Sequence, residues 1–415
     1  MSRPSERPPL MPLDEALASL LAKAEPRLDN ESVSTFEADG RVLAQDVESG
    51  LTVPPRDNSS MDGYAVRAAD CATAGAVLTV AQRIPAGSVG TPLAAGTAAR
   101  IFTGAQIPEG ADAVVMQEDT GALPEDGSLG RVRIDMVPAA GQWIRRAGED
   151  VAAGDVVLAR GERLTPAALG LAASVGFDRL QVARRPRVVL LSTGDELVMP
   201  GEVAPEAMKP GAIYNSNRFF MRALLTRLGC DVSDLGIVPD RRDATIDALR
   251  TAAEHHDLIV TTGGVSVGEE DHIKAAVEAL GELQLWSLSM KPGKPFAYGR
   301  IGNAHVTGLP GNPVSSFLTF LLLVRPFLLT LQGATRVAPE PVAMRADFDW
   351  PRADRRREFL RARRNAAGGL DLFPNQSSGV LTSAVWGDGV IDTPAGQSFR
   401  KGDTVQFISF ASLLA

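Results

Sequence analysis

Cysteine and histidine are scarce in this sequence, which has two cysteines, Cys71 and Cys230, and four histidines among 415 residues. Zinc sites in proteins are built largely from these two residue types. The composition therefore argues against a thiolate or imidazole metal centre. So few cysteines also suit a reducing compartment, and we expect a cytoplasmic protein.

The sequence also lacks a long basic run, and its formal net charge is −8. Nucleic-acid phosphates are bound by clustered Lys and Arg side chains. Nucleic acid is therefore not an expected partner. A small anionic ligand needs only a few local donors, so the net charge is compatible with one.

No apolar run is long enough to predict a membrane segment. Residues 1–9 are polar and proline-rich and contain no apolar signal core. The most apolar stretch, 314–324, is followed by Arg325-Pro326, and a run of that length is too short to cross a bilayer. We expect it to form a buried helix of a soluble domain.

What the sequence does contain is the composition of an ordinary globular protein, 45% hydrophobic and 22% charged. A chain of 415 residues is too long for one core, so two to four domains are expected. From about Glu31 to Arg184, Gly, Pro and Asp interrupt short Val-rich runs such as 76–80 and 113–116. This pattern of short strands and turns predicts two small β-rich domains.

From Arg185 to about Gly333 the pattern changes to alternating strands and helices. The predicted strands are 188–192, 232–238, 258–262 and 305–309. The predicted helices between them are 217–228, 243–255 and 271–280. Such alternation indicates a mainly parallel sheet with helices on both faces, a three-layer α/β domain. The remainder, 334–415, returns to short strands and predicts a small β-barrel or sandwich.

Four unusual loops each follow a predicted strand of the α/β region. They are STGDE at 192–196, VPD at 238–240, TTGGVSVG at 261–268 and GLPGNP at 308–313. In an open α/β sheet, ligands bind beyond the carboxyl ends of the strands. We therefore expect the four loops to open toward one crevice.

The glycine-rich loop has a physical use in such a crevice. Gly263, Gly264 and Gly268 would let the backbone approach a ligand closely, and the helix that starts near Glu269 would offer free N–H groups to a phosphate. A tight strand-to-helix turn would use the same glycines. The three neighbouring loops favour phosphate binding.

Three carboxylates lie near strand ends or helix starts in the same region: Glu196, Asp240 and Asp271. Two carboxylates 4 Å apart repel by roughly 4 kcal/mol at an effective dielectric of about 20. Convergence of these groups would therefore favour a cation, and all-oxygen ligation favours Mg²⁺. A helix-capping role for Asp271 is the alternative.

Two lysines share a stiff loop, KPGKP at 291–295, whose prolines and glycine hold Lys291 and Lys294 close together. Two ammonium groups so placed suit a phosphate or an oxyanion. An exposed lysine turn is the alternative reading. The following GNPVS segment opens the last helix, where Ser315 could donate its hydroxyl to an anion.

Seven segments of the sequence occur together in one order: DNSSMDGYA, RIFTGA, GED, STGDEL, GGVSVGEED, KPGKPF and GLPGNPVS. From about Pro12 to its C-terminus the sequence resembles the molybdopterin molybdenumtransferase (MoeA-type) family, whose animal relative is the gephyrin E domain. The resemblance implies an elongated homodimer of four-domain subunits. The fold class expected is multidomain α/β plus β, with an α/β domain of the molybdopterin-binding type.

The resemblance also sets the domain boundaries that we expect. They are an α/β molybdopterin-binding domain at 12–30 and 185–333, a β-rich linker domain at 31–51 and 149–184, a β-rich insertion at 52–148, and a C-terminal β-barrel domain at 334–415. The N-terminal helix would thus pack back onto the α/β domain.

The activity implied is insertion of molybdenum, from molybdate as substrate, into adenylyl-molybdopterin with Mg²⁺-dependent loss of AMP. The catalytic positions matched are Asp62, Thr103, Glu196, Asp240 and Asp271, the last three as Mg²⁺ ligands. The substrate-binding positions are Gly263, Gly264, Ser266, Gly268, Lys291, Lys294, Pro310, Pro313 and Ser315. In the C-terminal domain, Arg361 and Ser378 are implied as molybdate ligands.

The family pattern is not followed everywhere. The segment YNSN at 214–217 has Asn where an Asp is common, and Glu270 adds a carboxylate beside Asp271. Which of the two adjacent acids faces the metal is therefore open. The resemblance places Asp62 and Thr103 across the dimer interface from the α/β site, and it also allows a contact with the adenylyltransferase of the pathway.

Two other functions remain open. A molybdopterin adenylyltransferase of the same pathway shares the α/β fold, but it is normally a short single domain without the β-rich additions. A gephyrin-like scaffold would not need the acidic set. The sequence does not distinguish molybdate from tungstate, because both are tetrahedral dianions of similar size.

Overall fold

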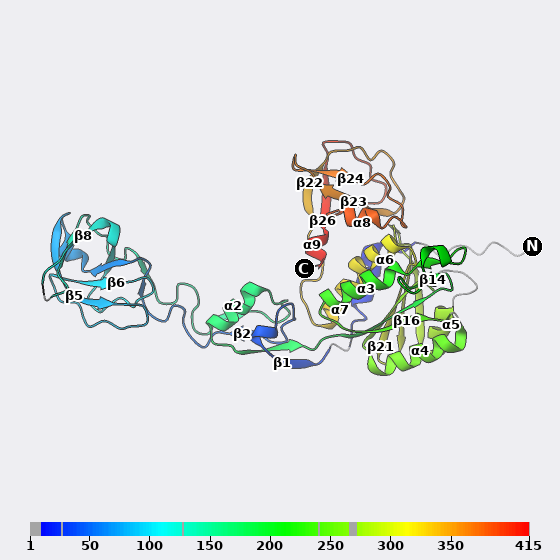
Figure 1. Ribbon diagram of the computed structural model, residues 1–415, viewed down its shortest axis with the longest axis horizontal. Coiled ribbons are helices and arrows are strands. Elements are labelled where there is room, and N and C mark those ends of the chain that lie inside the picture. Colours follow the sequence, from blue (N-terminus) through cyan, green and yellow to red (C-terminus); the bar gives the residue numbers. More distant parts are fainter. Residues whose placement is uncertain (1–9, 26–27, 127, 240, 265–271, 415) are drawn as a thin grey trace, which may run out of the picture.

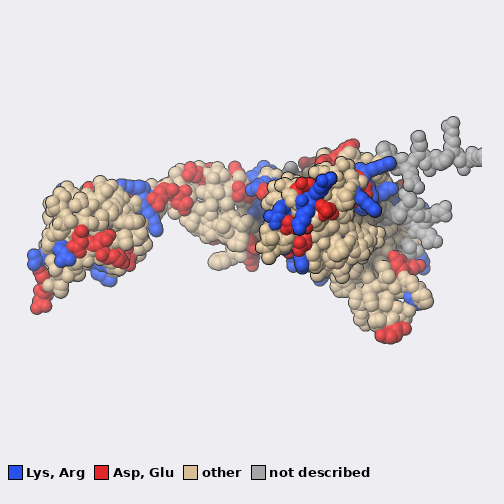
Figure 2. Space-filling view, turned by 90° about the horizontal axis from the view of Figure 1, so that it is seen from above, with Lys and Arg blue, Asp and Glu red and all other residues tan. Residues whose placement is uncertain are grey.

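The computed structural model describes residues 10–25, 28–126, 128–239, 241–264 and 272–414. The molecule is elongated, with a β-rich lobe at one end, a slender middle part, and the α/β region and C-terminal barrel at the other end (Figure 1). From above, acidic and basic side chains are interspersed along its length (Figure 2).

A six-stranded sheet forms the centre of the α/β region. Its strand order is β16 (Asp231–Val238), β13 (Arg187–Thr193), β17 (Leu258–Thr262), β21 (Ala304–Leu309), β20 (Pro295–Ile301) and β18 (Glu282–Ser287). The first four strands are parallel, while β20 runs antiparallel to both of its neighbours. The mainly parallel sheet expected from the sequence is confirmed. Its last two strands, β20 and β18, were not anticipated.

Helices cover both faces of this sheet. On one face α4 (Arg242–His255) and α5 (His272–Leu280) pack on the side chains of Val189, Leu191 and Ile259. On the other face α1 (Leu13–Leu21) and α3 (Ser216–Arg227) share a core with Val188 and Leu190. Alternate residues of β13 thus point to opposite layers. This confirms the three-layer α/β architecture.

The most apolar helix is longer than the sequence indicated. It continues from α6 (Pro313–Thr319) through a π-helical turn, 320–324, into α7 (Arg325–Leu331). The buried helix expected from the sequence is confirmed, and it continues past Arg325-Pro326. Proline is tolerated in the first turn of a helix, where its missing N–H is not needed, and the π-helical turn before it changes the hydrogen-bond pattern at this point.

This 19-residue helical stretch passes a test of length and composition for crossing a membrane, with a mean hydropathy of 1.9. However, 89% of an 18-residue segment of this stretch is buried inside the protein. It is packed as the core helix of the α/β region. Buried Arg325 lies on it and donates from Nη1 to the carbonyl of Val337 at 3.0 Å.

The middle part is made of short antiparallel pairs. β1 (Asn30–Ser34) pairs with β12 (Arg179–Ala183), and β2 (Val47–Glu48) pairs with β11 (Val156–Leu158) beside α2 (Pro166–Ser174). The chain passes through this part twice, on its way to the end lobe and on its return.

The end lobe contains a second six-stranded sheet. Its order is β7 (Ala113–Met116), β4 (Gly63–Val66), β6 (Thr97–Ile101), β5 (Ala76–Ile84), β9 (Arg131–Ile134) and β8 (Thr120–Leu123). The pair β3 (Asn58–Ser59) and β10 (Ile144–Arg145) lies where the chain enters and leaves the lobe.

Five strands near the C-terminus form a closed ring. They are β22 (Val342–Ala346), β23 (Arg357–Arg364), β24 (Gly369–Leu372), β25 (Gly389–Thr393) and β26 (Thr404–Ser409). Pairing of β23 with β25 closes the ring, which confirms the expected barrel. Two short helices, α8 (Thr382–Trp386) and α9 (Phe410–Leu414), accompany it. One further strand, β19 (Met290–Lys291), joins the same sheet from the α/β region.

Candidate functional site

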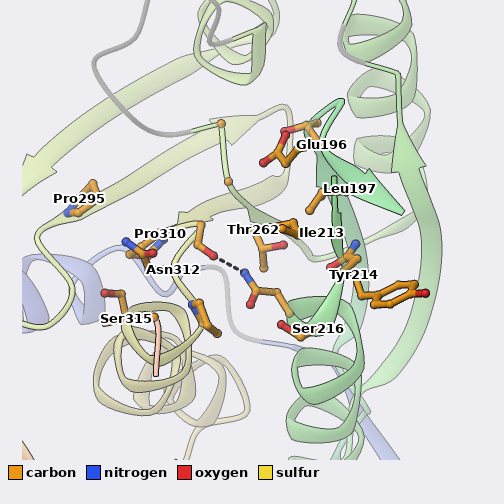
Figure 3. A pocket seen from close by; sticks show the side chains of 18 residues that line it. Glu196, Leu197, Ile213, Tyr214, Ser216, Thr262, Pro295, Pro310, Asn312 and Ser315 are labelled. Atoms are coloured by element: carbon orange, nitrogen blue, oxygen red, sulfur yellow. Dashed lines mark hydrogen bonds between the residues drawn. The ribbon is translucent and has the colours of Figure 1, made fainter. Parts of the chain in front are cut away.

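A cavity of about 790 Å³ lies at the carboxyl ends of β13, β17 and β21. Eighteen residues line it: Thr193, Glu196, Leu197, Ile213, Tyr214, Asn215, Ser216, Asn217, Thr262, Gly263, Gly264, Pro295, Pro310, Gly311, Asn312, Pro313, Ser315 and Gly379. Three of the four loops singled out in the sequence therefore meet here (Figure 3). The fourth contributes Val238 and Pro239 to a different groove, and its Asp240 lies outside the described residues.

Strand register explains why these loops meet. Ser192 lies beside Thr262, and Thr262 lies beside Leu309, so three parallel strands end at the same level. The N–H of Gly263 donates to the carbonyl of Leu309 at 3.0 Å. From α3, the Asn217 amide donates to the carbonyl of Gly311 at 2.8 Å (Figure 3). These bonds fix the backbone of the two loops.

Two positions in the cavity wall require glycine. Gly263 and Gly264 have φ values of +91° and +67°, where other residues are strained. A Cβ on Gly264 would lie 2.8 Å from Cγ1 of Ile273 and 3.0 Å from Oγ1 of Thr193. The glycines thus keep the cavity free of side chains at this point. The remaining predicted members of this loop, Ser266 and Gly268, lie outside the described residues.

Of the three predicted Mg²⁺ ligands, the structure describes one. Glu196 is exposed and lines the cavity beside Leu197 of β14 (Leu197–Val198), which pairs with β15 (Ile213–Tyr214). Asp240 and Asp271 lie outside the described residues. Within the part of the chain that is described, no group of three His, Cys, Asp or Glu could hold a metal ion. Glu196 alone does not make a Mg²⁺ site, so this site stays a prediction.

The opposite wall comes from the last strand-to-helix loop. Pro310, Pro313 and Ser315 line the cavity as expected, and Ser315 is only 4% exposed. The N–H of Val314 donates to the carbonyl of Ser378 at 3.0 Å. The C-terminal domain therefore reaches the rim of the cavity, where the next residue, Gly379, is part of the lining.

Arg361 is held inside the C-terminal domain, with 1% of its surface exposed. Its Nε donates to Ser383 Oγ at 3.1 Å, and its Nη atoms donate to the carbonyls of Phe359 and Ser377 at 3.1 and 3.2 Å. Burial lowers the pKa of Arg361 to about 10. It supports the loop that carries Ser378 and does not line the cavity, so its role as a molybdate ligand stays a prediction.

The two lysines of the KPGKP loop are also absent from the lining, which the loop reaches through Pro295. Lys294 is exposed. Lys291 donates from Nζ to Glu358 Oε1 at 2.9 Å and to Asp354 Oδ2 at 3.1 Å. Partial burial opposes the charge of this ammonium, but the two carboxylates outweigh it and raise the pKa of Lys291.

Asp62 and Thr103 lie together in the end lobe. Asp62 Oδ1 accepts hydrogen bonds from the Thr103 N–H at 2.8 Å and from its hydroxyl at 2.7 Å. These bonds lower the pKa of Asp62. Within one chain the lobe lies at the far end of the molecule from α6 (Figure 1). The structure brings the pair together but does not bring it to the cavity.

Two arginines beside this pair were missed by sequence reasoning. Arg100 donates to the carbonyl of Gly63 at 2.8 Å and to Gln117 Oε1 at 2.6 Å. Its guanidinium lies 4.7 Å from the ring centroid of Phe102, and that of Arg83 lies 4.6 Å from the same ring. Arg100 is part of the RIFTG motif, which was the sequence signal for it. Arg83 is distant from that motif in the chain, so the motif did not point to it.

Comparisons with known proteins cover nearly the whole chain. Residues 11–176 match the family model "MoeA N-terminal region (domain I and II)", 189–330 match "Probable molybdopterin binding domain", and 343–410 match "MoeA C-terminal region (domain IV)". The chain is 44% identical over 325 residues to molybdopterin molybdenumtransferase of Haemophilus influenzae, covering 78% of each chain. It is 37% identical over 393 residues to molybdopterin molybdenumtransferase 2 of Mycobacterium tuberculosis, covering 88% of this chain and 90% of the relative.

A solved structure is similar over the same extent. The molybdopterin biosynthesis MoeA protein from Pyrococcus horikoshii OT3 matches with a TM-score of 0.81 and 30% identity, covering 97% of this chain and 100% of the other. The similarity therefore includes the end lobe, the middle part, the α/β region and the C-terminal barrel.

Proposed function

The chain belongs to the molybdopterin molybdenumtransferase (MoeA) family, and from this premise we propose that it inserts molybdenum into molybdopterin during molybdenum cofactor synthesis. The observation that carries the proposal is the cavity at the ends of β13, β17 and β21, because it lies within the part of the chain that matches a molybdopterin-binding domain. Open α/β sheets bind ligands at this edge.

The substrate of the proposed reaction is adenylyl-molybdopterin, and molybdate is the second substrate. Water cleaves the phosphoanhydride bond between the pterin phosphate and AMP, and AMP leaves. The two dithiolene thiols then bind the molybdenum of molybdate, and their two protons leave with one molybdate oxygen as water. The side-chain-free backbone at 263–264 permits close approach of a phosphate, and Ser315 supplies a buried hydroxyl as donor. Ser266 and Gly268 would extend the same phosphate-binding loop.

Mg²⁺ would be held by Glu196 with Asp240 and Asp271. When bound, it would neutralise charge on the phosphoanhydride and on the departing AMP phosphate. Support for this ion is the exposed carboxylate of Glu196 on the cavity wall, together with the family resemblance of the other two positions.

The proposed enzyme is a homodimer in which the end lobe of one subunit faces the cavity of its partner. Asp62 and Thr103 have a fixed mutual geometry but lie far from the cavity of their own chain. A two-fold dimer would place each pair at the other subunit's site. Contact with the adenylyltransferase that supplies the substrate is a further expectation.

The test is to supply purified protein with adenylyl-molybdopterin and molybdate, with and without Mg²⁺, and to measure AMP release and reconstitution of a molybdenum-free apoenzyme. We expect both products, and only with Mg²⁺ present. An adenylyltransferase would instead convert the adenylylated substrate and pyrophosphate to ATP, and a scaffold would give no turnover. Replacing molybdate by tungstate in parallel determines which oxyanion is preferred.

A further inference from the structure

The lysine loop of the α/β region is also part of the C-terminal barrel. β19 pairs in parallel with β23, which places Met290 beside Arg357 and Lys291 beside Glu358. The N–H of Arg357 donates to the carbonyl of Ser289 at 3.0 Å. The position of the loop is therefore set by the barrel as well as by the α/β sheet.

The ammonium of Lys291 reaches from this strand to two carboxylates of the barrel domain. Its distances are 2.9 Å to Glu358 Oε1 and 3.1 Å to Asp354 Oδ2. A lysine ammonium has three N–H donors. Two of them are used here, which leaves one for a ligand.

Both carboxylates are themselves held in place. Glu358 is only 2% exposed, and its second oxygen accepts from the Trp350 indole at 3.0 Å. Asp354 accepts from the N–H of Arg356 at 3.0 Å and from its Nε at 3.2 Å. Neither acid can follow Lys291 to a new position without losing these partners.

We propose that Glu358, assisted by Asp354, is a positioning residue of the transferase. Glu358 fixes the Lys291 ammonium between the two domains, so that the third N–H of Lys291 can bind the anionic substrate. The proposal rests on the proposed function, because it takes Lys291 to be a substrate contact. Pro295, four residues further along the loop, lines the cavity, so displacement of the loop would also alter the site.

A bridge that served only stability would predict different behaviour. Removing the charge of Glu358 would then lower the melting temperature. Any effect of this change on substrate binding would be the same whether Lys291 was present or replaced. A positioning residue acts through its lysine. Its removal should therefore have no effect on binding once Lys291 has been replaced.

The first experiment is a double-mutant cycle on the full-length protein with Glu358→Gln and Lys291→Gln, measuring Kd for adenylyl-molybdopterin and KM and kcat for AMP release. Glutamine keeps the shape of Glu358 and an acceptor for Trp350. We expect Glu358→Gln to raise Kd and KM about tenfold, the effect of losing one charge-assisted hydrogen bond, with kcat changed less than about twofold. In the Lys291→Gln background Kd should not rise further. Equal effects in both backgrounds would overturn the proposal.

Asp347→Asn is the matched control. Asp347 lies in the same barrel domain, where it pairs with Arg345 at 2.8 Å and accepts from the Asn365 amide at 2.8 Å. We expect this variant to leave Kd and KM within about twofold of the native values. An increase equal to that of Glu358→Gln would show a general effect of weakening the barrel and would contradict positioning.

A second measurement does not depend on turnover. The sequence has only six lysines, so ¹³C-lysine labelling gives a short spectrum in which Lys291 is assigned by Lys291→Gln. The pKa of Lys291 should be lower in Glu358→Gln than in the native protein, with the other lysines unchanged. An unchanged Lys291 would overturn the proposal. If the native protein showed this coupling but released no AMP, the proposed function would fail while the Lys291–Glu358 link stood.

Discussion

The cavity of the α/β region and the Asp62–Thr103 pair of the end lobe differ in how complete they are. The cavity is enclosed by the ends of three strands, and lining residues such as Thr262 and Ser315 are 3% and 4% exposed. Asp62 and Thr103 are both exposed, and what fixes them is chiefly their mutual hydrogen bonds. The cavity is formed within one chain, whereas the exposed pair would need a second surface to form one.

This difference has a consequence for mutations. A change in the cavity should damage the site of the chain that carries it. A change at Asp62 should damage the site of the partner subunit, if the lobe faces that site as proposed. Mutations in the two regions should therefore complement each other between subunits, and two mutations within one region should not.

The largest expected effect tests this contrast directly. Asp62→Asn and Glu196→Gln should each reduce AMP release at least about a hundredfold, because each replaces a carboxylate that the proposed reaction uses. A mixed dimer would have one site with both defects and one with neither. Refolding an equimolar mixture makes half of the dimers mixed, so activity should recover to about a quarter of the native value.

The control for this experiment is a mixture of Glu196→Gln and Ser315→Ala, which change the same cavity, so its activity should equal the mean of the two homodimers and not exceed it. Formation of mixed dimers is checked with two affinity tags. If mixed dimers of Asp62→Asn and Glu196→Gln form but stay inactive, the lobe and the cavity do not belong to different subunits of one site.

A smaller effect is expected from adding a side chain to the glycine loop in the cavity wall. Gly264→Ala places a Cβ 2.8 Å from Ile273 at a φ of +67°. Gly176→Ala shares the positive φ, at +93°, but meets no atom within 4 Å. Both should lose about 1–2 kcal/mol of stability from backbone strain, and Gly264→Ala should lose more because its Cβ also presses on Ile273. Only Gly264→Ala should also weaken substrate binding, by about tenfold, as measured by titration.

Equal substrate affinity in the two alanine variants would show that Gly264 serves only as a turn residue. That outcome would leave the cavity as a candidate site but would remove the glycine loop from it. The comparison is informative because both variants carry the same type of strain and only one of them lines the cavity.

The sequence predicted the cavity better than the lobe for a physical reason. Parallel strands and crossover helices have strong periodic signals, and the carboxyl ends of such strands meet by topology alone. The loops at 192–196, 261–264 and 308–313 could therefore be placed together without coordinates. Asp62 and Thr103 are 41 residues apart, in turns next to short strands, and only the family resemblance connected them.

The contacts of the C-terminal barrel could not be found in this way. Lys291 and Asp354 are 63 residues apart, and their hydrogen bond joins two domains. No local pattern encodes the pairing of β19 with β23. The continuation of the helix past Arg325-Pro326 has a related cause, because tertiary burial and a π-helical turn accommodate a proline at this point.

The smallest expected effect concerns the ionisation of Asp62, and it tests the role of the end lobe in the comparison with the cavity. Hydrogen bonds from the Thr103 N–H and hydroxyl lower the pKa of Asp62, which keeps this carboxylate ionised in more acidic solution. Thr103→Val removes the hydroxyl bond and retains the backbone bond, so the pKa of Asp62 should rise toward its usual value. Activity that needs the ionised carboxylate should then be lost at a higher pH as the solution is acidified. Activity at neutral pH should fall by less than about fivefold, in line with a hydrogen bond of about 1 kcal/mol.

Thr97→Val is the control, because it removes another exposed hydroxyl bond of the same lobe, to the carbonyl of Ala94. This variant should leave the acidic limb of the pH–rate profile unchanged. Since the lobe is proposed to act on the partner's site, the native limb should return in isolated mixed dimers of Thr103→Val with Glu196→Gln, because the intact cavity of the first chain then faces the native lobe of the second. A profile that does not move in the Thr103→Val homodimer would mean that Asp62 is not the ionised group on which the reaction depends.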